Sequence, residues 1–345
     1  MKRKLGLLFL VGSCVLSAFA QKNTPLFQSP LFQSKEALNL QATGSIKSIK
    51  KETNDSTFVS VKFEYEASPG NWQSLPLEAR VRGNFRLRYC YFPPLKLKFR
   101  KKDIDSTIFE GNKSLKLVVP CRNTSDMNNL IRREYLCYKF YETLTPYYFK
   151  TRLANLKLTE LSTKKPHIYD LLSIMVEDNS NVAKRAGGRI MEVKGLSPAA
   201  FEEKQALRND YFQFMIGNAD WSALYQHNTN VLYADGKYIT LSYDFDMSGF
   251  VNALYARENP PNLGTGDPRD RVYRGFCRTE ASMQEIRKEY LDKEVALQSL
   301  IDEEAKYFNE MELKEMRSYM TDFFRIFKND TQFENLILKA CRAEH

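Results

Sequence analysis

The chain has 345 residues and a formal net charge of +9. This length exceeds what a single simple hydrophobic core usually supports, so two structural units are expected. The excess of 51 basic over 42 acidic residues is mild and spread along the chain. It would suit phosphate-rich ligands, but it is too weak to predict binding to nucleic acid.

The N-terminal segment 1–20 has the pattern of an export signal. Basic residues at positions 2–4 precede an apolar run at 5–16, and Ala-Phe-Ala at 18–20 fits a signal-peptidase site. The run is too short to span a bilayer, and no later segment is apolar enough to be transmembrane. Apolar residues continue past Cys14, which argues against a lipid anchor there. The sequence therefore predicts an exported protein, periplasmic or extracellular, with association with the cell envelope left open.

The cysteines that follow this segment are Cys90, Cys121, Cys137, Cys277 and Cys341. Their spacing matches no zinc-binding motif, and an odd number of widely spaced cysteines predicts mostly buried free thiols. A single disulfide between Cys90 and Cys121 is an alternative if the compartment is oxidising.

Residues 21–40 are expected to form an irregular arm. The next unit, 41–178, is predicted to be rich in β-structure, because apolar and polar residues alternate with a period of two in several short runs. Its predicted strands are 57–65, 77–82, 95–99, 115–119, 153–161 and 167–176, and its one main helix is 126–144. The last unit, 179–345, is predicted to be helical after residue 199 apart from one β-hairpin.

Strand 95–99 and helix 126–144 each carry charged residues of interest. The strand places its apolar residues on one face and Lys96 and Lys98 on the other. Glu134 lies on the apolar face of the helix, where a carboxylate needs a cationic partner. Protein kinases pair a strand lysine with a helix glutamate near the nucleotide phosphates, so Lys98 and Glu134 are predicted to pair. Alternatively, both lysines are solvated residues of a sheet edge.

A β-hairpin is predicted within the polar-rich stretch 216–250. Its apolar strands, 230–234 and 238–243, are joined by an Asp-Gly turn, which readily supplies the two positive φ angles of a tight hairpin. An antiparallel hairpin brings its two ends together, so Asn230 is expected to lie beside Asp244.

Asp220 should reach the same place from the end of the preceding helix, for which Gly217 is the predicted C-cap. An acid, an asparagine and a second acid that converge form the oxygen-ligand set of phosphotransferases. Asp220 would orient the acceptor hydroxyl, while Asn230 and Asp244 would hold Mg²⁺ or Mn²⁺ on the phosphates of ATP. Asn228 and Asp246 are the nearest substitutes for these two ligands. Taken singly, each of these residues could instead cap a helix or close a turn.

The order of these units is that of a protein kinase. A β-rich unit with one main helix precedes a helical unit that contains a hairpin of ligands. The predicted fold class is therefore α+β with a protein-kinase-like two-lobe architecture, in which 41–178 forms the nucleotide-facing lobe and 179–345 the helical lobe.

The chain also resembles the spore-coat-protein-H (CotH) family of atypical protein kinases. The resemblance is carried by Gly-Asn-Ala-Asp at 217–220, by an Asn-led strand after it, and by Tyr-Asp-Phe-Asp at 243–246. In that comparison Asp220 matches the catalytic aspartate, Asn230 the metal-binding asparagine, and Asp244 the aspartate that corresponds to the kinase Asp-Phe-Gly motif.

The resemblance extends over residues 75–255 and implies roles for two further side chains. Arg82 belongs to an element that resembles the family's Arg-Gly-Asn, and Glu177 matches an acid that the family places at the lobe junction. The chain lacks a Gly-x-Gly-x-x-Gly loop. Covering the phosphates would therefore fall to residues 82–84 or their neighbours.

Two functions of different classes follow. The first is an exported CotH-like kinase that transfers phosphate from a Mg²⁺- or Mn²⁺-nucleotide to a hydroxyl of a protein or peptide. The second is a catalytically silent, kinase-shaped binding or cell-envelope structural protein, since an exported protein meets little ATP. A weaker enzymatic alternative keeps the metal site but acts on a sugar or transfers the nucleotide itself.

Overall fold

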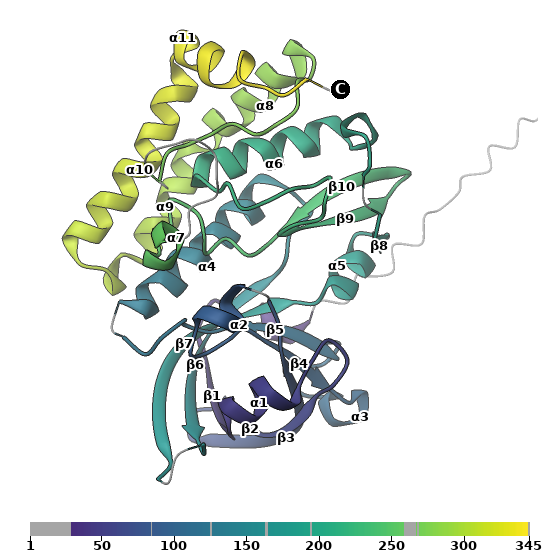
Figure 1. Ribbon diagram of the computed structural model, residues 1–345, viewed down its shortest axis with the longest axis vertical. Coiled ribbons are helices and arrows are strands. Elements are labelled where there is room, and N and C mark those ends of the chain that lie inside the picture. Colours follow the sequence, from purple (N-terminus) through teal and green to yellow (C-terminus); the bar gives the residue numbers. More distant parts are fainter. Residues whose placement is uncertain are drawn as a thin grey trace, which may run out of the picture.

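The computed structural model describes residues 29–343, except for residues 84, 125, 163–164, 194, 259–266 and 268. The predicted export signal and the first part of the predicted arm lie outside these described residues. Figure 1 shows a β-barrel below and a mainly helical part above, with a small three-stranded sheet beside the helices. Among the described helices, none is long and apolar enough to cross a membrane.

Seven strands form the barrel, in the order β1-β2-β3-β4-β5-β7-β6. Their bounds are Leu38–Gly44 (β1), Val59–Ser68 (β2), Asn71–Val81 (β3), Leu95–Phe99 (β4), Ser114–Val118 (β5), Thr151–Glu160 (β6) and His167–Glu177 (β7). All six strands predicted for this unit exist, and the largest differences lie at the start of β3 and the end of β2. The period-two pattern was sufficient to locate them because each has at least one face on an apolar core.

The closure of the barrel depends on β1, which the sequence did not predict. Leu40 of β1 lies opposite Tyr65 of β2 in an antiparallel ladder and opposite Leu156 of β6 in a parallel one. The predicted kinase-like two-lobe architecture is therefore wrong: the sheet is a closed mixed barrel. Residues 38–40 had been assigned to the irregular arm and no strand was predicted at 41–44, whereas without β1 the sheet would have two open edges.

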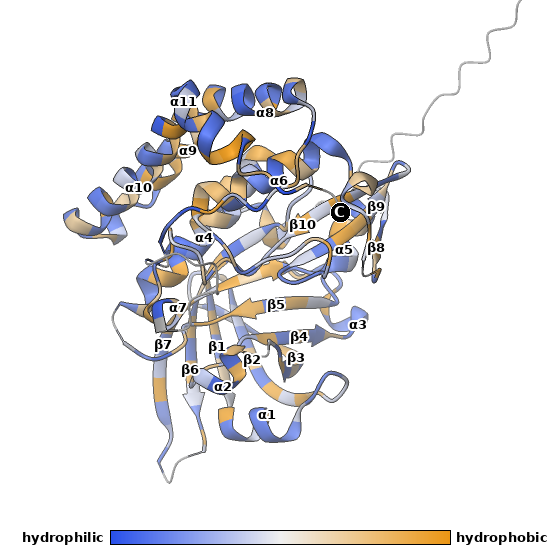
Figure 2. Ribbon diagram, turned by 45° about the horizontal axis from the view of Figure 1, so that its top comes forward, coloured by the Kyte–Doolittle hydropathy of each residue, from blue (hydrophilic) through white to orange (hydrophobic). Residues whose placement is uncertain are grey.

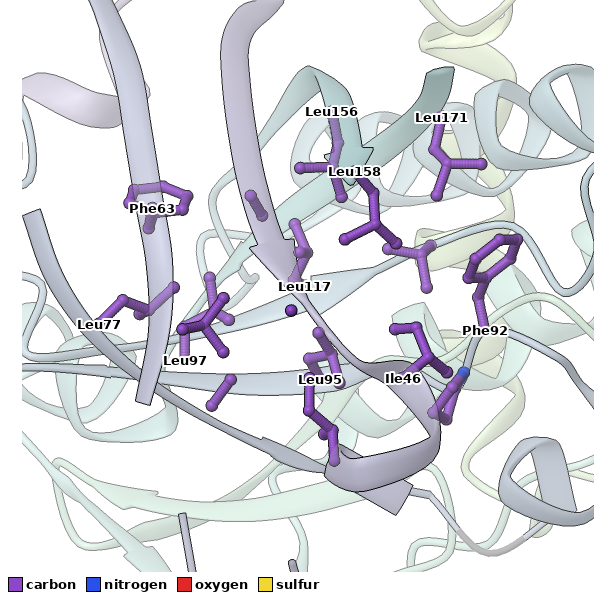
Figure 3. Close-up of a pocket in the computed structure, with 17 residues that line it drawn as sticks. Ile46, Phe63, Leu77, Phe92, Leu95, Leu97, Leu117, Leu156, Leu158 and Leu171 are labelled. Carbon is purple, nitrogen blue, oxygen red and sulfur yellow. The ribbon is translucent and has the colours of Figure 1, made fainter. Parts of the chain in front are cut away.

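The interior of the barrel is a packed apolar core. Figure 2 shows hydrophilic and hydrophobic residues interleaved along the barrel strands, as expected when one face points inward. In Figure 3, leucines from several strands converge with Ile46 of α1 (Ile46–Glu52) and with Phe92. The space left between them is about 40 Å³ and its walls are apolar. It is too small for a drug-sized ligand and offers almost no polar partner to water.

Helix α4 (Met127–Leu144) packs into the helical part, although in sequence it lies between strands of the barrel. Its buried side chains belong to the same hydrophobic cluster as those of α6, α8, α9 and α10. This position is a second departure from the prediction, which had placed the helix in the β-rich unit. The remaining helices are α2 (Phe85–Tyr89), α3 (Lys101–Ile104), α5 (Asn179–Arg185), α6 (Glu203–Ile216), α7 (Leu254–Glu258), α8 (Glu280–Asp292), α9 (Glu294–Glu303), α10 (Glu310–Lys328) and α11 (Asp330–Phe333).

Two disulfides connect segments that lie far apart in the sequence. Cys90 is bonded to Cys121, and Cys277 is bonded to Cys341, while Cys137 of α4 is free and buried. The expectation of mostly free thiols is therefore wrong. Sequence spacing could not predict the second pair, because it requires the C-terminal segment to return to Cys277, beside the isolated bridge between Phe276 and Arg342. Two disulfides are typical of proteins from oxidising compartments.

Candidate active site

The predicted hairpin is present in the small sheet. β9 (Thr229–Ala234) and β10 (Lys237–Ser242) pair antiparallel, and β8 (Arg189–Met191) adds a third strand. The turn residues Asp235 and Gly236 have φ angles of 51° and 76°, which confirms the predicted Asp-Gly turn. The hairpin thus carries the polar residues that precede β9 and follow β10 to the same end of the sheet.

The register of the hairpin distinguishes the two candidate asparagines. Asn230 lies opposite Leu241, whereas the carbonyl of Asn228 accepts a hydrogen bond of 3.1 Å from the backbone N–H of Tyr243. Asn228 is therefore nearer to Asp244 along the ladder than Asn230 is. The side-chain nitrogen of Asn230 is buried and has no hydrogen-bond partner among the described residues.

Asp220 lies just beyond the end of α6. The helix ends at Gly217, whose φ of 61° confirms it as the left-handed C-cap that the sequence predicted. One carboxylate oxygen of Asp220 lies 2.7 Å from His227 Nε2, and the other accepts a hydrogen bond of 3.0 Å from Asn228 Nδ2. Both oxygens of the predicted catalytic acid are thus already hydrogen-bonded within the site.

The contact with Asp220 also affects the protonation of the His227 ring. The hydrogen bond to Asp220 is the main reason that the pKa of His227 lies above its usual value, and Asp244 adds to the effect while Arg274 opposes it. The His227 side chain is 59% exposed and that of Asp220 is 32% exposed. An exposed imidazole held by a carboxylate is able to exchange a proton with a group outside the protein.

The carboxylates of Glu134, Asp244 and Asp246 interact electrostatically with one another. Burial is the main cause that raises the pKa of Asp246 to about 6, and the charge of Asp244 adds to it. Burial, followed by the charges of Asp246 and Asp244, raises the pKa of Glu134 well above its usual value. Glu134 is 1% exposed, and its Oε1 has no hydrogen-bond partner among the described residues.

The two aspartates are held differently. The backbone N–H of Asp244 donates to the hydroxyl of Tyr138 at 3.1 Å, and its φ of 64° places it in the left-handed region. Asp246 accepts a hydrogen bond of 2.8 Å from the Tyr255 hydroxyl, and its nearest cation, Arg86 Nε, is 3.9 Å away. Asp244 is therefore the more open of the two carboxylates for an external ligand.

Lys116 of β5 contributes a buried amino group to the same region. Its side chain donates to Asn179 at 2.8 Å and lies over the ring of Tyr243, 4.5 Å from the ring centroid. Desolvation is the main cause that holds its pKa well below the usual value, and the nearby Arg82 lowers it further, while Asp244 raises it. Lys116 therefore interacts electrostatically with the basic residue Arg82 and with the acid Asp244.

Two other basic side chains, those of Arg82 and Lys96, contact residues near Lys116. The guanidinium of Arg82 lies 5.9 Å from the ring centroid of Tyr243, and Lys96 Nζ lies 3.6 Å from Asp178. The sequence had indicated Arg82 and Lys96, but it missed Arg86 and Lys116. A usable signal existed for Lys116, because a lysine inside a continuous apolar run is costly to bury without a function or a partner.

The predicted pairing of Lys98 with Glu134 is wrong. Lys98 Nζ lies 2.8 Å from Glu78 of β3, and the two residues are direct neighbours in the antiparallel ladder. Both side chains are on the outer face of the barrel, about half exposed, whereas Glu134 is buried among the acids. The exposure of Lys98 agrees with the alternative that it is a solvated lysine, although β4 is paired on both sides and is not a sheet edge.

The carboxylate of Glu177 is engaged by contacts within the protein. Its Oε2 accepts hydrogen bonds from the backbone of Lys150 and from Arg185, both at 3.0 Å. It thus links the end of β7 to α5 at the junction of the two parts. These contacts explain its burial without any ligand.

Comparison of the chain with protein-family models and with curated proteins finds no match. Within the described ranges, no three histidine, cysteine, aspartate or glutamate side chains meet in a way that could hold a metal ion by themselves. Mg²⁺ commonly uses only one or two protein carboxylates and completes its coordination with substrate phosphates and water. The donor set of Asp244 and Asn228 or Asn230 fits that second type of site.

Proposed function

We propose that this protein transfers the terminal phosphoryl group of a nucleotide such as ATP, bound with Mg²⁺ or Mn²⁺, to a hydroxyl of a protein or peptide. The reaction would take place where the barrel meets the helical part, between Asp220, Asp244 and Lys116. This is the activity that the CotH resemblance implies, on a barrel scaffold instead of a two-lobe one.

The observation that carries this proposal is the burial of interacting carboxylates. Glu134 and Asp246 have pKa values raised by burial and by Asp244, so their ionised forms cost free energy in the protein alone. A divalent cation beside Asp244 would offset that cost. Asp244 and one asparagine would be its protein ligands, with phosphate oxygens supplying others.

The basic residues that interact with these acids support the same reaction. Lys116, Arg82 and Arg86 lie close enough to the acids to change their pKa values or to have their own changed. A phosphate chain would accept charge-assisted hydrogen bonds from such groups. Of these three, Lys116 would gain most, because a dianionic neighbour favours the charged form that burial now disfavours.

The Asp220–His227 pair would act on the acceptor. In the transfer, the acceptor oxygen forms a bond to the γ-phosphorus while the bond from that phosphorus to the β–γ bridging oxygen breaks. The acceptor's proton would pass to the neutral His227 ring, whose other nitrogen is held by Asp220 at 2.7 Å. Nucleoside diphosphate and a phosphate ester are the products.

One observation favours a second function. Both carboxylate oxygens of Asp220 are hydrogen-bonded, to His227 and Asn228. A carboxylate satisfied in this way could simply stabilise the loop that precedes β9. In a binding or envelope-associated protein without phosphotransfer, the Asp220 carboxylate could keep both of these hydrogen bonds permanently.

A thermal-shift titration with ATP, with and without Mg²⁺ or Mn²⁺, separates the two functions. A nucleotide bound well below its test concentration should stabilise the protein by about RT ln(1 + [L]/Kd), close to 3 kcal/mol at one hundred times Kd. The shift should require the metal and should be lost in Asp244→Asn. An unchanged melting temperature with every nucleotide and metal would reject the proposal and leave the binding function.

A matched pair of lysine variants provides the control. Lys116→Met should remove most of the nucleotide-dependent shift, because it deletes the buried cation. Lys98→Met removes an exposed lysine from the neighbouring strand and should leave the shift unchanged. Equal losses in both variants would indicate non-specific binding of the nucleotide to basic residues.

A further inference from the structure

A polar groove lies on the outside of the barrel. The residues that line it differ in type from those of the candidate active site. Its volume is about 610 Å³, which is within the range of small-molecule sites. One wall is the outer face of β1, β6 and β7, and the other is the first turns of α4 with Tyr307. This groove contains none of the residues assigned to phosphoryl transfer.

The floor of the groove is a row of amides across neighbouring strands. Asn39 of β1 and Asn155 of β6 are paired in the ladder, and Asn155 Nδ2 donates to Asn39 Oδ1 at 2.9 Å. Asn39 Nδ2 in turn donates to Glu66 of β2 at 2.6 Å, and Glu66 lies opposite Trp72 of β3. The Trp72 indole, 38% exposed, therefore stands at the end of a hydrogen-bonded row.

A second row runs beside the first and has free hydrogen-bonding capacity. Gln41 of β1 lies opposite Lys157 of β6, which lies opposite Asp170 of β7. Within the described part of the chain, no hydrogen bond or ion pair engages these three side chains. They present an amide, an ammonium and a carboxylate on one face, and together they can both donate and accept.

The charges of the groove nearly cancel. Lys157 and Asp170 are neighbours of opposite sign, and the guanidinium of Arg132 is bound to Glu304 at 2.6 Å. The same guanidinium covers the ring of Tyr307, 3.3 Å from the ring centroid, so this wall is fixed and its cation is neutralised. An anionic ligand would find no excess of positive charge, and an acidic or basic peptide no complementary field.

We propose that this groove binds a neutral glycan chain. Rows of amide and carboxyl groups on adjacent strands match the closely spaced hydroxyls of pyranose rings, which need both donors and acceptors. The exposed indole of Trp72 offers a rigid apolar face for the C–H face of one sugar ring, with a polar N–H at its edge. The site would tether the protein to a polysaccharide while the candidate active site remains free.

The chain allows a direct optical test, because its only tryptophans are Trp72 and the buried Trp221. In the Trp221→Phe protein, Trp72 is the sole tryptophan, and its emission should shift to the blue when a sugar ring covers it. The probes are cellohexaose, maltohexaose and chitohexaose, with calorimetry as the second measurement. At least one of them should give a saturable shift.

Variants of the groove decide whether binding occurs there. Trp72→Ala should weaken the calorimetric affinity about tenfold or more, whereas Trp72→Phe should retain most of it. Asn155→Ala should weaken it severalfold, and Tyr225→Ala, which removes an aromatic that is 72% exposed and outside the groove, should not. No saturable binding of any probe, unaltered binding in Trp72→Ala, or binding only of phosphorylated oligosaccharides would overturn the proposal. Nucleotide-dependent thermal shifts should be the same in Trp72→Ala as in the wild type, so the two proposals can fail separately.

Discussion

Two faces on the outside of the barrel, one open to solvent and one covered by the helical part, place a lysine in opposite environments. Lys98 lies on β4, where the outer face meets solvent; its side chain is 54% exposed and pairs with Glu78. Lys116 lies on the adjacent strand β5, whose outer face is covered by the helical part; it is 7% exposed and its pKa is lowered by desolvation. A charge on the first face costs little, whereas a charge on the second requires compensation, and this is why the second face is the better candidate for function.

The largest expected effect concerns the acceptor side of the site. Asp220→Asn should reduce the rate of phosphoryl transfer by about 10²–10⁴, because the His227 ring would lose the group that orients it and stabilises its charge. Nucleotide affinity should stay within severalfold of the wild-type value. Phosphorylation of a generic protein substrate and calorimetric binding of Mg²⁺-ATP measure the two quantities. A rate equal to that of the wild type would remove Asp220 from the mechanism.

The next effect contrasts the two lysines. Lys116→Met should weaken nucleotide binding about 10- to 100-fold, since it removes a charge-assisted contact in a buried place. Lys98→Met should change it little. The variants Lys98→Met and Glu134→Gln should also act additively on nucleotide affinity, because their side chains belong to different faces. A strong coupling between them would contradict the separation of the two faces.

Glu134 extends the comparison of the exposed and covered faces to the stability of the protein. Glu134→Gln should stabilise the nucleotide-free protein by about 1 kcal/mol near pH 7.5, because it removes a buried carboxylate that faces other acids. The same change should reduce the stabilisation by Mg²⁺-ATP. Chemical denaturation with and without the metal–nucleotide measures both. Destabilisation comparable to the loss of a buried ion pair would mean that Glu134 is already neutralised by Arg86 and Arg82.

The pH dependence of stability follows from the same acids. Asp246 keeps its proton to about pH 6 in the folded protein, against 3.8 as its usual value. The folded state therefore binds more protons than the unfolded state in this window, so stability should fall as the pH rises from about 4 to about 6. Mg²⁺-ATP should stabilise the protein more above this window than within it. Equal stabilisation at pH 5 and pH 8 would show that the metal does not compensate these acids.

The smallest expected effect on stability is that of the exposed His227. Its folded-state pKa is raised by Asp220, so the pair contributes stability below the usual histidine pKa and loses that contribution as pH rises through the raised value. The transfer rate should instead rise with pH through the same value, since only the neutral ring can accept a proton. A His227→Gln protein should lose this limb of the pH–rate profile. A profile identical to that of the wild type would assign the acceptor proton to Asp220 alone.

Local patterns predicted much of the fold, and the failures share one cause. The six predicted barrel strands, the helix now labelled α4, the Asp-Gly hairpin and the Gly217 cap were read from short stretches, and all are present. β1 was missed because its outer positions, Asn39 and Gln41, lie next to a stretch with no regular pattern. Its place in the sheet depends on a partner strand more than 100 residues away, which no local window contains.

The candidate site shows the same division between features that a local pattern predicts and features that depend on distant residues. The polar residues around the hairpin could be named in advance because a turn of known geometry joins two apolar strands. The partners of charged groups could not: Lys98 was matched to Glu134 by analogy, although its neighbour is Glu78 across the ladder. Arg86 of α2 gave no signal, because arginine side chains are ordinarily solvated.

What the sequence determined by itself is the set of elements whose signal is short-range: strand alternation, helix and turn boundaries, and a compact group of acids and asparagines at 217–246. What only the tertiary structure decided is which faces of these elements are covered. The closure of the barrel by β1 and β6, the covering of the outer face of β5, and the packing of α4 among the other helices set the desolvation of Lys116, Glu134 and Asp246. Desolvation depends on everything packed around a group, so it cannot be read from the residues next to it in the chain.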